Sequence, residues 1–249
     1  MRWIFIDPII ILFTGIMATI SVFFSLFDGR GILQHKCAQI WARFIIKVSG
    51  AKIEIEGLEK INPDETYIIT ANHQSYFDIW TLLAYMPFQF RFLAKDSLFK
   101  TPFLGWHLKR SGNIPIHREN PVKSVKSIKN AAQKVKEGTS LCIFPEGSRS
   151  SDGKIREFKP GVFYLAILSQ KPILPVTIIG SRFLLPKGSI KIRSGKIKVI
   201  ISDPIDTSQY TKKDIEKLIK IVKDRIISNF DEKLIIKNEV EKDETINFQ

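Results

Sequence analysis

Residues 67–78, reading YIITANHQSYFD, constrain the fold of this chain more than any other stretch. Tyr67 to Thr70 are β-branched or aromatic residues, which favour a buried strand. Ser75 followed three residues later by Asp78 is typical of a capping box that opens a helix. The stretch therefore predicts a strand, a loop and a helix in succession, with His73 on the loop and Asp78 in the first helical turn.

This arrangement has the ingredients of a histidine general base with an orienting aspartate. A loop that follows a buried strand can direct a side chain into a cleft. A carboxylate one helical turn away can fold back and hold the imidazole of His73 in a single tautomer. Two simpler interpretations stay open at this point: Asp78 serves only as the capping residue, and His73 is an ordinary solvated loop histidine.

The rest of the chain after Gly50 alternates between strand and helix patterns, which predicts an α/β fold with a mixed sheet flanked by helices. The predicted strands cover residues 52–57, 67–71, 90–94, 113–116, 140–144, 173–180, 190–193 and 196–202. The predicted helices between and after them cover residues 120–138, 160–169 and 211–226. The length of 249 residues suits one sizeable core, so we expect a catalytic domain at 51–230 and a charged, disordered tail at 231–249.

The beginning of the chain has a different character. Residues 9–27 carry no charge, and a helix of that length, at about 1.5 Å per residue, covers roughly 28 Å, just enough to cross a bilayer. They predict either a single span or a segment buried in one leaflet. Residues 33–48 form an amphipathic pattern that suits a membrane interface or the surface of a core. We therefore expect membrane-embedded and interfacial helices at 1–50, with the following domain on the cytoplasmic side because cations follow the segment closely.

Charge and cysteine content limit the partners. A formal net charge of +13, from 38 Lys and Arg against 25 Asp and Glu, indicates a polyanionic partner: nucleic acid, anionic lipid or a phosphorylated substrate. Charge alone does not choose among the three. Cys37 and Cys142 lack metal-ligand spacing and are typical of buried thiols in a reducing compartment, and the four histidines lack it too, so no metal is expected.

Two further stretches carry candidate binding groups. In FPEGSRS, at 144–150, Gly147 lets backbone amides approach a ligand and Arg149 offers a planar fork for a phosphate. Glu146 would repel that phosphate unless it orients Arg149 or binds a substrate hydroxyl. In SGNIPIHR, at 111–118, Arg118 ends a short strand, and Lys95 holds the equivalent place after another. These cations either converge into an anion site or are ordinary surface residues.

Together the stretches resemble a known family. NHQSYFD at 72–78 is similar to the N-H-x4-D block of the 1-acyl-sn-glycerol-3-phosphate acyltransferases, and GNIPIHR, FPEGSRS and ILPVTI at 173–178 are similar to their second, third and fourth blocks. The departures are Ser148 in place of the common threonine, and Pro115 with His117 in the second block, which bear on the acceptor. The resemblance covers residues 72–178 and implies a glycerolipid acyltransferase-like fold.

The resemblance implies transfer of a fatty acyl group from a thioester to the sn-2 hydroxyl of lysophosphatidic acid. His73 would be the base and Asp78 its orienting partner, while Arg118, Glu146, Gly147 and Arg149 would hold the glycerol phosphate and Lys95 would contact phosphate or donor. Acyl-CoA or acyl carrier protein would be the co-substrate, with no cofactor. The enzyme would act at the cytoplasmic face of a membrane, that of a bacterial inner membrane, and would not bind nucleic acid.

Alternatives within and outside the enzyme class remain. An acyltransferase for glycerol 3-phosphate or for another lysolipid would share the four blocks. A non-catalytic protein that binds anionic lipid or nucleic acid would share the basic charge, although the chain shows no recognisable nucleic-acid module. A serine hydrolase is disfavoured because neither Ser75 nor Ser148 lies in a G-x-S-x-G turn.

Overall fold

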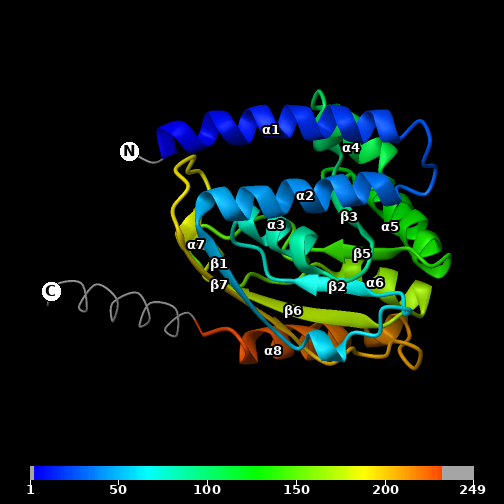
Figure 1. The fold of residues 1–249 in the computed structure, drawn as a ribbon. Helices are drawn as coiled ribbons and strands as arrows, with labels where there is room; N and C mark the ends of the chain where they lie inside the picture. Colours follow the sequence, from blue (N-terminus) through cyan, green and yellow to red (C-terminus); the bar gives the residue numbers. More distant parts are fainter. Residues whose placement is uncertain (1–2, 232–249) are drawn as a thin grey trace, which may run out of the picture.

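The computed structural model describes residues 3–231, with side chains from residue 8 onward, and within that range a seven-stranded mixed sheet forms the centre of the molecule (Figure 1). The strand order is β1-β7-β6-β2-β5-β3-β4. All neighbours pair in parallel except β6 and β7, which are antiparallel. The strands are β1 (Ala51–Glu56), β2 (Ile68–Ala71), β3 (Phe90–Lys95), β4 (Ile114–Ile116), β5 (Ser140–Ile143), β6 (Ile173–Ile179) and β7 (Gly195–Ile201).

Helices cover both faces of this sheet. They are α1 (Trp3–Phe24), α2 (Ile32–Ser49), α3 (Tyr76–Tyr85), α4 (Leu104–Arg110), α5 (Pro121–Lys136), α6 (Pro160–Ser169), α7 (Ser181–Leu184) and α8 (Ile215–Ser228), with short 3-10 turns at 58–60, 96–100 and 212–214. One apolar cluster joins α2 and α3 to the sheet, and a second joins α5, α6 and α8 to its other face. Figure 1 shows α1 lying on α2, with α8 on the far side of the sheet.

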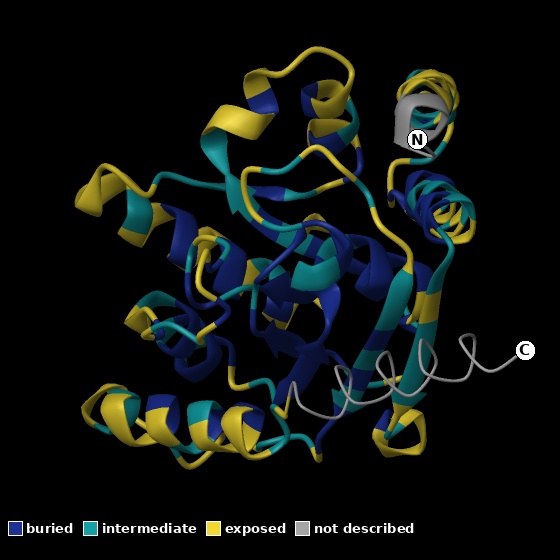
Figure 2. Cartoon of the chain, turned by 90° about the vertical axis from the view of Figure 1, so that its left-hand side faces the viewer, coloured by how far each residue is buried: buried dark blue, intermediate teal, exposed yellow. Residues whose placement is uncertain are grey.

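The central strands of the sheet are covered by helices on both faces. Every residue of β2, β5 and β6 is buried, so these strands read as continuous apolar runs, as expected for parallel strands covered by helices. At one side of the sheet, β7 alternates between buried and half-buried residues from Ile197 onward, and the edge strand β1 has only half-buried and exposed residues. Figure 2 shows the interior in dark blue, with yellow mainly on outer helix faces and loops. The carboxyl ends of β2 and β5 therefore emerge from a rigid core.

The predicted mixed sheet flanked by helices is confirmed, and most predicted elements agree with the observed bounds to within two residues. The strand predicted at 190–193 is wrong. That segment follows a turn at Gly188, has Ile190 at 74% exposed, and crosses from α7 to the start of β7 without joining the sheet. Within β7, only residues 198–201 pair with β6. The alternating residues at 190–193 therefore have, among the described residues, no neighbouring strand with which to form backbone hydrogen bonds.

The two N-terminal helices form a hairpin against the domain. Trp41 of α2 donates to Thr14 of α1 and packs edge-on against Trp80 of α3. α2 therefore packs one face against the core, where Ala42 and Ile45 are fully buried. Among the described residues, no helix has the length and apolar character needed to cross a membrane. The membrane-embedded part of the predicted fold is accordingly unsupported, and the tail predicted at 231–249 lies outside the described residues apart from Asp231.

A buried arginine fastens the turn between α1 and α2 to β3. Arg91 is 6% exposed and donates to the carbonyl oxygens of Phe90, Arg30 and Gly31 at 3.0, 2.8 and 3.1 Å. Gly31 has φ +70°, and a Cβ there would lie 2.6 Å from Arg91 Nη2. Two histidines flank this site: the buried His35 packs edge-on against Phe90, and the half-buried His107 has its Nδ1 2.6 Å from Ser21 Oγ of α1.

These histidines predict that the protein loses stability in mild acid. Burial, and secondarily the charge of Arg91, lowers the pKa of His35 and of His107 from 6.5 to about 4. Between those values the unfolded chain binds protons that the folded chain does not, so unfolding becomes easier as pH falls. Glu146 has the opposite effect: burial raises its pKa to about 7, so the folded chain binds a proton that the unfolded chain does not. This one carboxyl group offsets only part of the effect of the two histidines.

We expect a net loss on the order of 1–3 kcal/mol in the free energy of unfolding between pH 6.5 and 4.5. Urea unfolding followed by fluorescence across that range measures it. A His35→Leu, His107→Gln double variant should remove or reverse the slope. A parent protein whose stability stays level or rises on acidification would contradict the assignment.

Candidate active site

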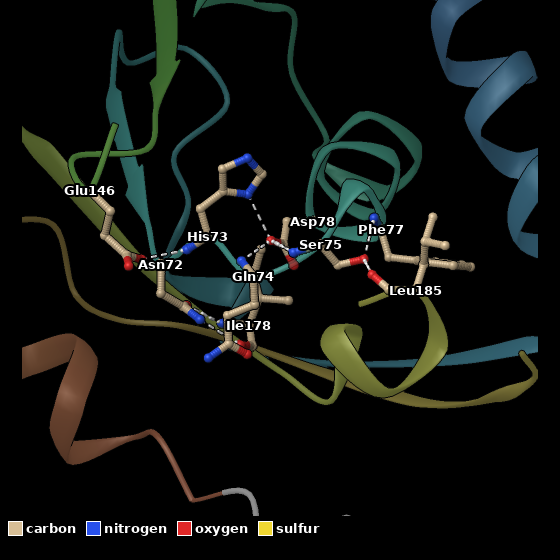
Figure 3. A network of polar contacts seen from close by, with 9 residues as sticks. All are labelled: Asn72, His73, Gln74, Ser75, Phe77, Asp78, Glu146, Ile178 and Leu185. Atoms are coloured by element: carbon tan, nitrogen blue, oxygen red, sulfur yellow. Dashed lines mark hydrogen bonds and ion pairs between the residues drawn. The ribbon is translucent and has the colours of Figure 1, made fainter. Parts of the chain in front are cut away.

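The loop from Asn72 to Ser75 joins the buried end of β2 to α3, and its first residue is tied to the neighbouring strand. The Asn72 amide donates to the carbonyl oxygen of Ile178 and accepts from the Ile178 N–H, both at 2.8 Å. Asn72 is fully buried. This two-way contact, visible in Figure 3, replaces a backbone pair and fixes where the loop leaves the sheet.

His73 and Asp78 lie in direct contact. His73 Nδ1 is 2.8 Å from Asp78 Oδ2, and the same oxygen accepts the backbone N–H groups of Gln74 at 2.7 Å and Ser75 at 2.8 Å. Ser75 and Asp78 also complete the predicted capping box of α3. The cap and the histidine partner are therefore the same carboxylate.

This contact determines which nitrogen of His73 is available. A carboxylate only accepts, so Nδ1 carries the proton and Nε2 is left with its lone pair. Figure 3 shows the second ring nitrogen on the side of the imidazole away from Asp78. The ring stacks on Phe144 with centroids 3.9 Å apart and planes inclined by 14°, and the side chain is 12% exposed. The structure thus holds an imidazole that is fixed, oriented and able to accept a proton.

Glu146 faces the backbone of this loop. Its Oε1 accepts the His73 N–H at 2.7 Å and its Oε2 accepts the Arg156 N–H at 2.9 Å. Glu146 is 4% exposed, and burial raises its pKa to about 7 against the opposing effect of these two donors. Both carboxylate oxygens are engaged, so the observed geometry is that of a group that positions His73. The sequence predicted instead a contact with Arg149 or with a substrate hydroxyl.

The third block is fastened to the first by further contacts. Ser150 N–H donates to the His73 carbonyl oxygen at 2.8 Å, and Gln74 Nε2 donates to the Gly153 carbonyl oxygen at 2.5 Å. Ser75 Oγ donates to the carbonyl oxygen of Leu185 at 2.8 Å. The loop that carries His73 is thus held from several distant parts of the chain, which keeps the imidazole in one place.

Arg118 and Gly147 meet beside a pocket. Arg118 Nη1 donates to the Gly147 carbonyl oxygen, and the side chain of Lys159 lies over Gly147, where a Cβ would be 2.9 Å from Lys159 Cε. Gly147 has φ +74°, a conformation that glycine adopts readily. The adjoining pocket has a volume of about 230 Å³, and its lining includes Phe144, the residue on which His73 stacks.

Arg149 and Lys95 make contacts of their own. The Arg149 guanidinium stands 3.8 Å over the ring of Tyr76, at the start of α3, and its Nη1 is buried without a hydrogen-bond partner. A buried donor without a partner is unusual in a folded protein, which marks this nitrogen as a candidate binding group. Lys95 is exposed and pairs with Glu119 at 3.0 Å. Sequence reasoning missed the backbone role of Glu146 and the cation Lys159, which depend on contacts between distant segments.

The fold and site define a class of protein: an α/β enzyme in which a histidine, oriented by a buried carboxylate, can take a proton from a hydroxyl beside cationic groups. The acyltransferase family model matches residues 52–179, which include the whole of this site. A chloroplast 1-acyl-sn-glycerol-3-phosphate acyltransferase of Brassica napus is 36% identical over 76% of this chain and 56% of its own length. A yeast enzyme of the same name is 31% identical over 88% and 73%.

A solved structure extends the likeness to the fold. The crystal structure of the 1-acyl-sn-glycerophosphate acyltransferase PlsC from Thermotoga maritima matches with a TM-score of 0.74 and 28% identity, covering 91% of this chain and 95% of that one. The chain belongs to the acyltransferase family, among the 1-acyl-sn-glycerol-3-phosphate acyltransferases, which confirms the resemblance seen in the four blocks. It spans little more than half the length of the two chloroplast relatives from Brassica napus and Arabidopsis thaliana.

Proposed function

We propose that this protein transfers a fatty acyl group from a thioester to the sn-2 hydroxyl of lysophosphatidic acid, which gives phosphatidic acid. The observation that carries the proposal is the contact between His73 Nδ1 and Asp78 Oδ2, which leaves Nε2 to act as a base. The family and the printed names of its relatives supply the acyl chemistry and the acceptor.

The reaction needs a base because a hydroxyl is a poor nucleophile at neutral pH. His73 Nε2 takes the hydroxyl proton as the oxygen attacks the thioester carbonyl, and Asp78 stabilises the imidazolium that forms. The tetrahedral intermediate then collapses and the carbon–sulfur bond breaks. The imidazolium of His73 returns its proton to the sulfur, which leaves as the free thiol. No covalent acyl-enzyme is required. The stacked contact with Phe144 keeps the imidazole in line throughout.

The phosphate of the acceptor is assigned to the cationic groups around the loop. The proposed groups are Arg118, which contacts the backbone at Gly147, and Arg149, whose Nη1 has no partner. Lys95 is proposed as a phosphate or donor contact. Binding a phosphate remote from the reacting hydroxyl positions that hydroxyl, and this raises the rate.

The proposed setting is the cytoplasmic face of a membrane, that of a bacterial inner membrane. The acceptor and the product both carry acyl chains that are costly to transfer into water. Supporting this, large apolar side chains of α1 and of the following turn are exposed: Ile9, Ile11, Leu12, Ile16, Ile20, Phe23, Leu26 and Phe27. The thioester of coenzyme A or of acyl carrier protein is the co-substrate, and no cofactor is proposed.

The test is acyl transfer by purified protein in detergent, with lysophosphatidic acid, glycerol 3-phosphate and lysophosphatidylcholine offered separately as acceptors. We expect phosphatidic acid from the first and at least 10-fold less product from the others. Equal activity on lysophosphatidylcholine would overturn the acceptor assignment, because that lipid lacks a phosphate monoester. Preference for glycerol 3-phosphate would reassign the enzyme to the earlier acylation.

Removing the charge of Arg118 should weaken acceptor binding. We expect Arg118→Gln to raise the KM for lysophosphatidic acid about 10-fold or more, since a charge-assisted hydrogen bond is worth roughly 1.5–3 kcal/mol. The matched control is Arg225→Gln on α8, which removes an exposed arginine paired with Asp203. Initial rates over a range of acceptor concentrations separate KM from kcat. An unchanged KM would remove Arg118 from the site.

A further inference from the structure

The outer face of α5 carries an unusual concentration of positive charge. The helix reads PVKSVKSIKNAAQKVK and contains five lysines and no acidic residue. Lys123, Lys126, Lys129 and Lys136 are exposed, and Lys134 is half-buried. Within the described residues, these five form none of the ion pairs that occupy many other lysines. We call this surface, residues 123, 126, 129, 134 and 136, the lysine face.

Three lysines of the lysine face work against the helix that carries them, whereas Lys134 and Lys136 lie in its last turn, where the helix dipole favours cations. Lys123, Lys126 and Lys129 are spaced by three, so their charges lie along one stripe and repel each other by roughly 0.2–0.5 kcal/mol per pair. Lys123 also lies in the first turn, where the helix dipole disfavours a cation. The inward residues Ile128, Ala131 and Val135 already secure the helix to the sheet. The fold does not need Lys123, Lys126 and Lys129, which points to an anionic partner outside the chain.

The helix that carries the lysine face also lines the pocket of the candidate active site. Ser124 and Ile128 of α5 line the same pocket as Arg118, Gly147 and Phe144. Phe144 in turn stacks on the imidazole of His73. A partner resting on α5 would therefore be placed to deliver a substrate toward the base, and this inference rests on the proposed function.

The shape of the lysine face favours a protein over a nucleotide. From Lys123 to Lys136 the charges extend over about 20 Å of a convex helix. A nucleotide's phosphates are compact and are best held by cations that converge in a hollow. Val122 is 80% exposed and Val125 is 48% exposed, so the face also offers apolar contacts among the charges, as a protein interface does.

A lipid bilayer fits this surface less well. The large exposed apolar side chains concentrate on α1, which packs on α2, whereas α5 packs with α6 in the cluster on the other face of the sheet. We propose that the lysine face is the docking site for an acidic acyl carrier protein, which brings the acyl group to the pocket as a thioester.

The test reverses the charge of three lysines. The variant K123E/K126E/K129E changes only exposed positions and places a carboxylate in the first turn of α5, where the helix dipole favours it, so it should fold about as well as the parent. The control K213E/K217E/K220E makes the same change in net charge around the start of α8. Thermal unfolding of both variants establishes that each is folded.

Binding of palmitoyl-loaded acyl carrier protein is measured directly, at two salt concentrations. We expect binding to be at least 10-fold weaker for the α5 variant and its salt dependence to be reduced, while the α8 control stays within 2-fold of the parent. Equal binding by parent and α5 variant would overturn the proposal. So would equal weakening in the α8 control, because net charge and not the lysine face would then be responsible.

Kinetics separate the remaining outcomes. With palmitoyl carrier protein the α5 variant should show a KM raised at least 10-fold and an unchanged kcat, and with palmitoyl-N-acetylcysteamine, which lacks carrier and nucleotide, it should match the parent. An equal rise in KM for palmitoyl-CoA would assign the face to the nucleotide instead. Weakened binding to phosphatidylglycerol vesicles with carrier binding intact would assign it to the bilayer. Lysine-dependent carrier binding by a parent that makes no phosphatidic acid would reject the proposed function and keep the docking site.

Discussion

Replacing His73 with alanine is expected to lower the rate of acyl transfer by at least ~100-fold, because general-base catalysis contributes roughly 10²–10⁴-fold. The substitution removes the only group in the described site whose geometry leaves a nitrogen free to accept the proton. The backbone contacts of residue 73, its N–H to Glu146 and its carbonyl oxygen to Ser150, do not require the side chain. The loop should therefore keep its path, and kcat should fall while the KM for the acceptor changes little.

The chain provides a matched control for this experiment. His117 Nδ1 lies 2.8 Å from Asp96 Oδ2, the same separation as in the His73–Asp78 pair, but its side chain is 39% exposed. His117→Ala should retain most of the activity. Single-turnover rates with both variants, at matched thermal stability, make the comparison. If His73→Ala transfers acyl groups as fast as the parent, another base performs the reaction.

The second large effect is expected from Asp78→Asn, which should lower kcat by about 10²-fold or more without unfolding the protein. The asparagine oxygen can replace Oδ2 as acceptor for His73, Gln74 and Ser75, so the capping contacts of α3 are preserved. Its NH₂ group takes the place of Oδ1, which is buried without a partner. What is lost is the negative charge that stabilises the imidazolium.

Two further variants distinguish the effect of the lost charge on catalysis from an effect on stability. Asp78→Ala also leaves two backbone N–H groups without an acceptor, so it should cost roughly 1–3 kcal/mol of stability for each group in addition to activity. Asp96→Asn, at the exposed pair, should affect neither property appreciably. Full activity in a folded Asp78→Asn enzyme would show that the aspartate only caps the helix.

The dyad was predictable from sequence because both partners lie within one strand, loop and helix. His73 and Asp78 are five positions apart, and the spacing alone constrains them. Glu146 was not predictable in the same way, since its role depends on Arg156 and on a loop 73 positions earlier. Its carboxylate was expected to face a ligand or Arg149, and it faces backbone amides.

The same distinction applies to the fold. The order of strands and helices follows from local patterns, and these predicted the central α/β alternation. Which alternating segments join the sheet depends on available neighbours, and residues 190–193 had none. The pattern of residues 33–48 suits a membrane surface and a core equally, and the packing of α2 on the core depends on distant contacts such as that of Trp41 with Trp80.

The attachment of Asn72 to Ile178 has a consequence for synthesis. These residues are 106 positions apart, so the loop that holds His73 cannot be fixed until the chain beyond β6 has left the ribosome. At about 5–20 residues per second, that delay is roughly 5–20 s. During this interval the nascent chain carries an unplaced imidazole, and the enzyme becomes competent only when its central sheet closes.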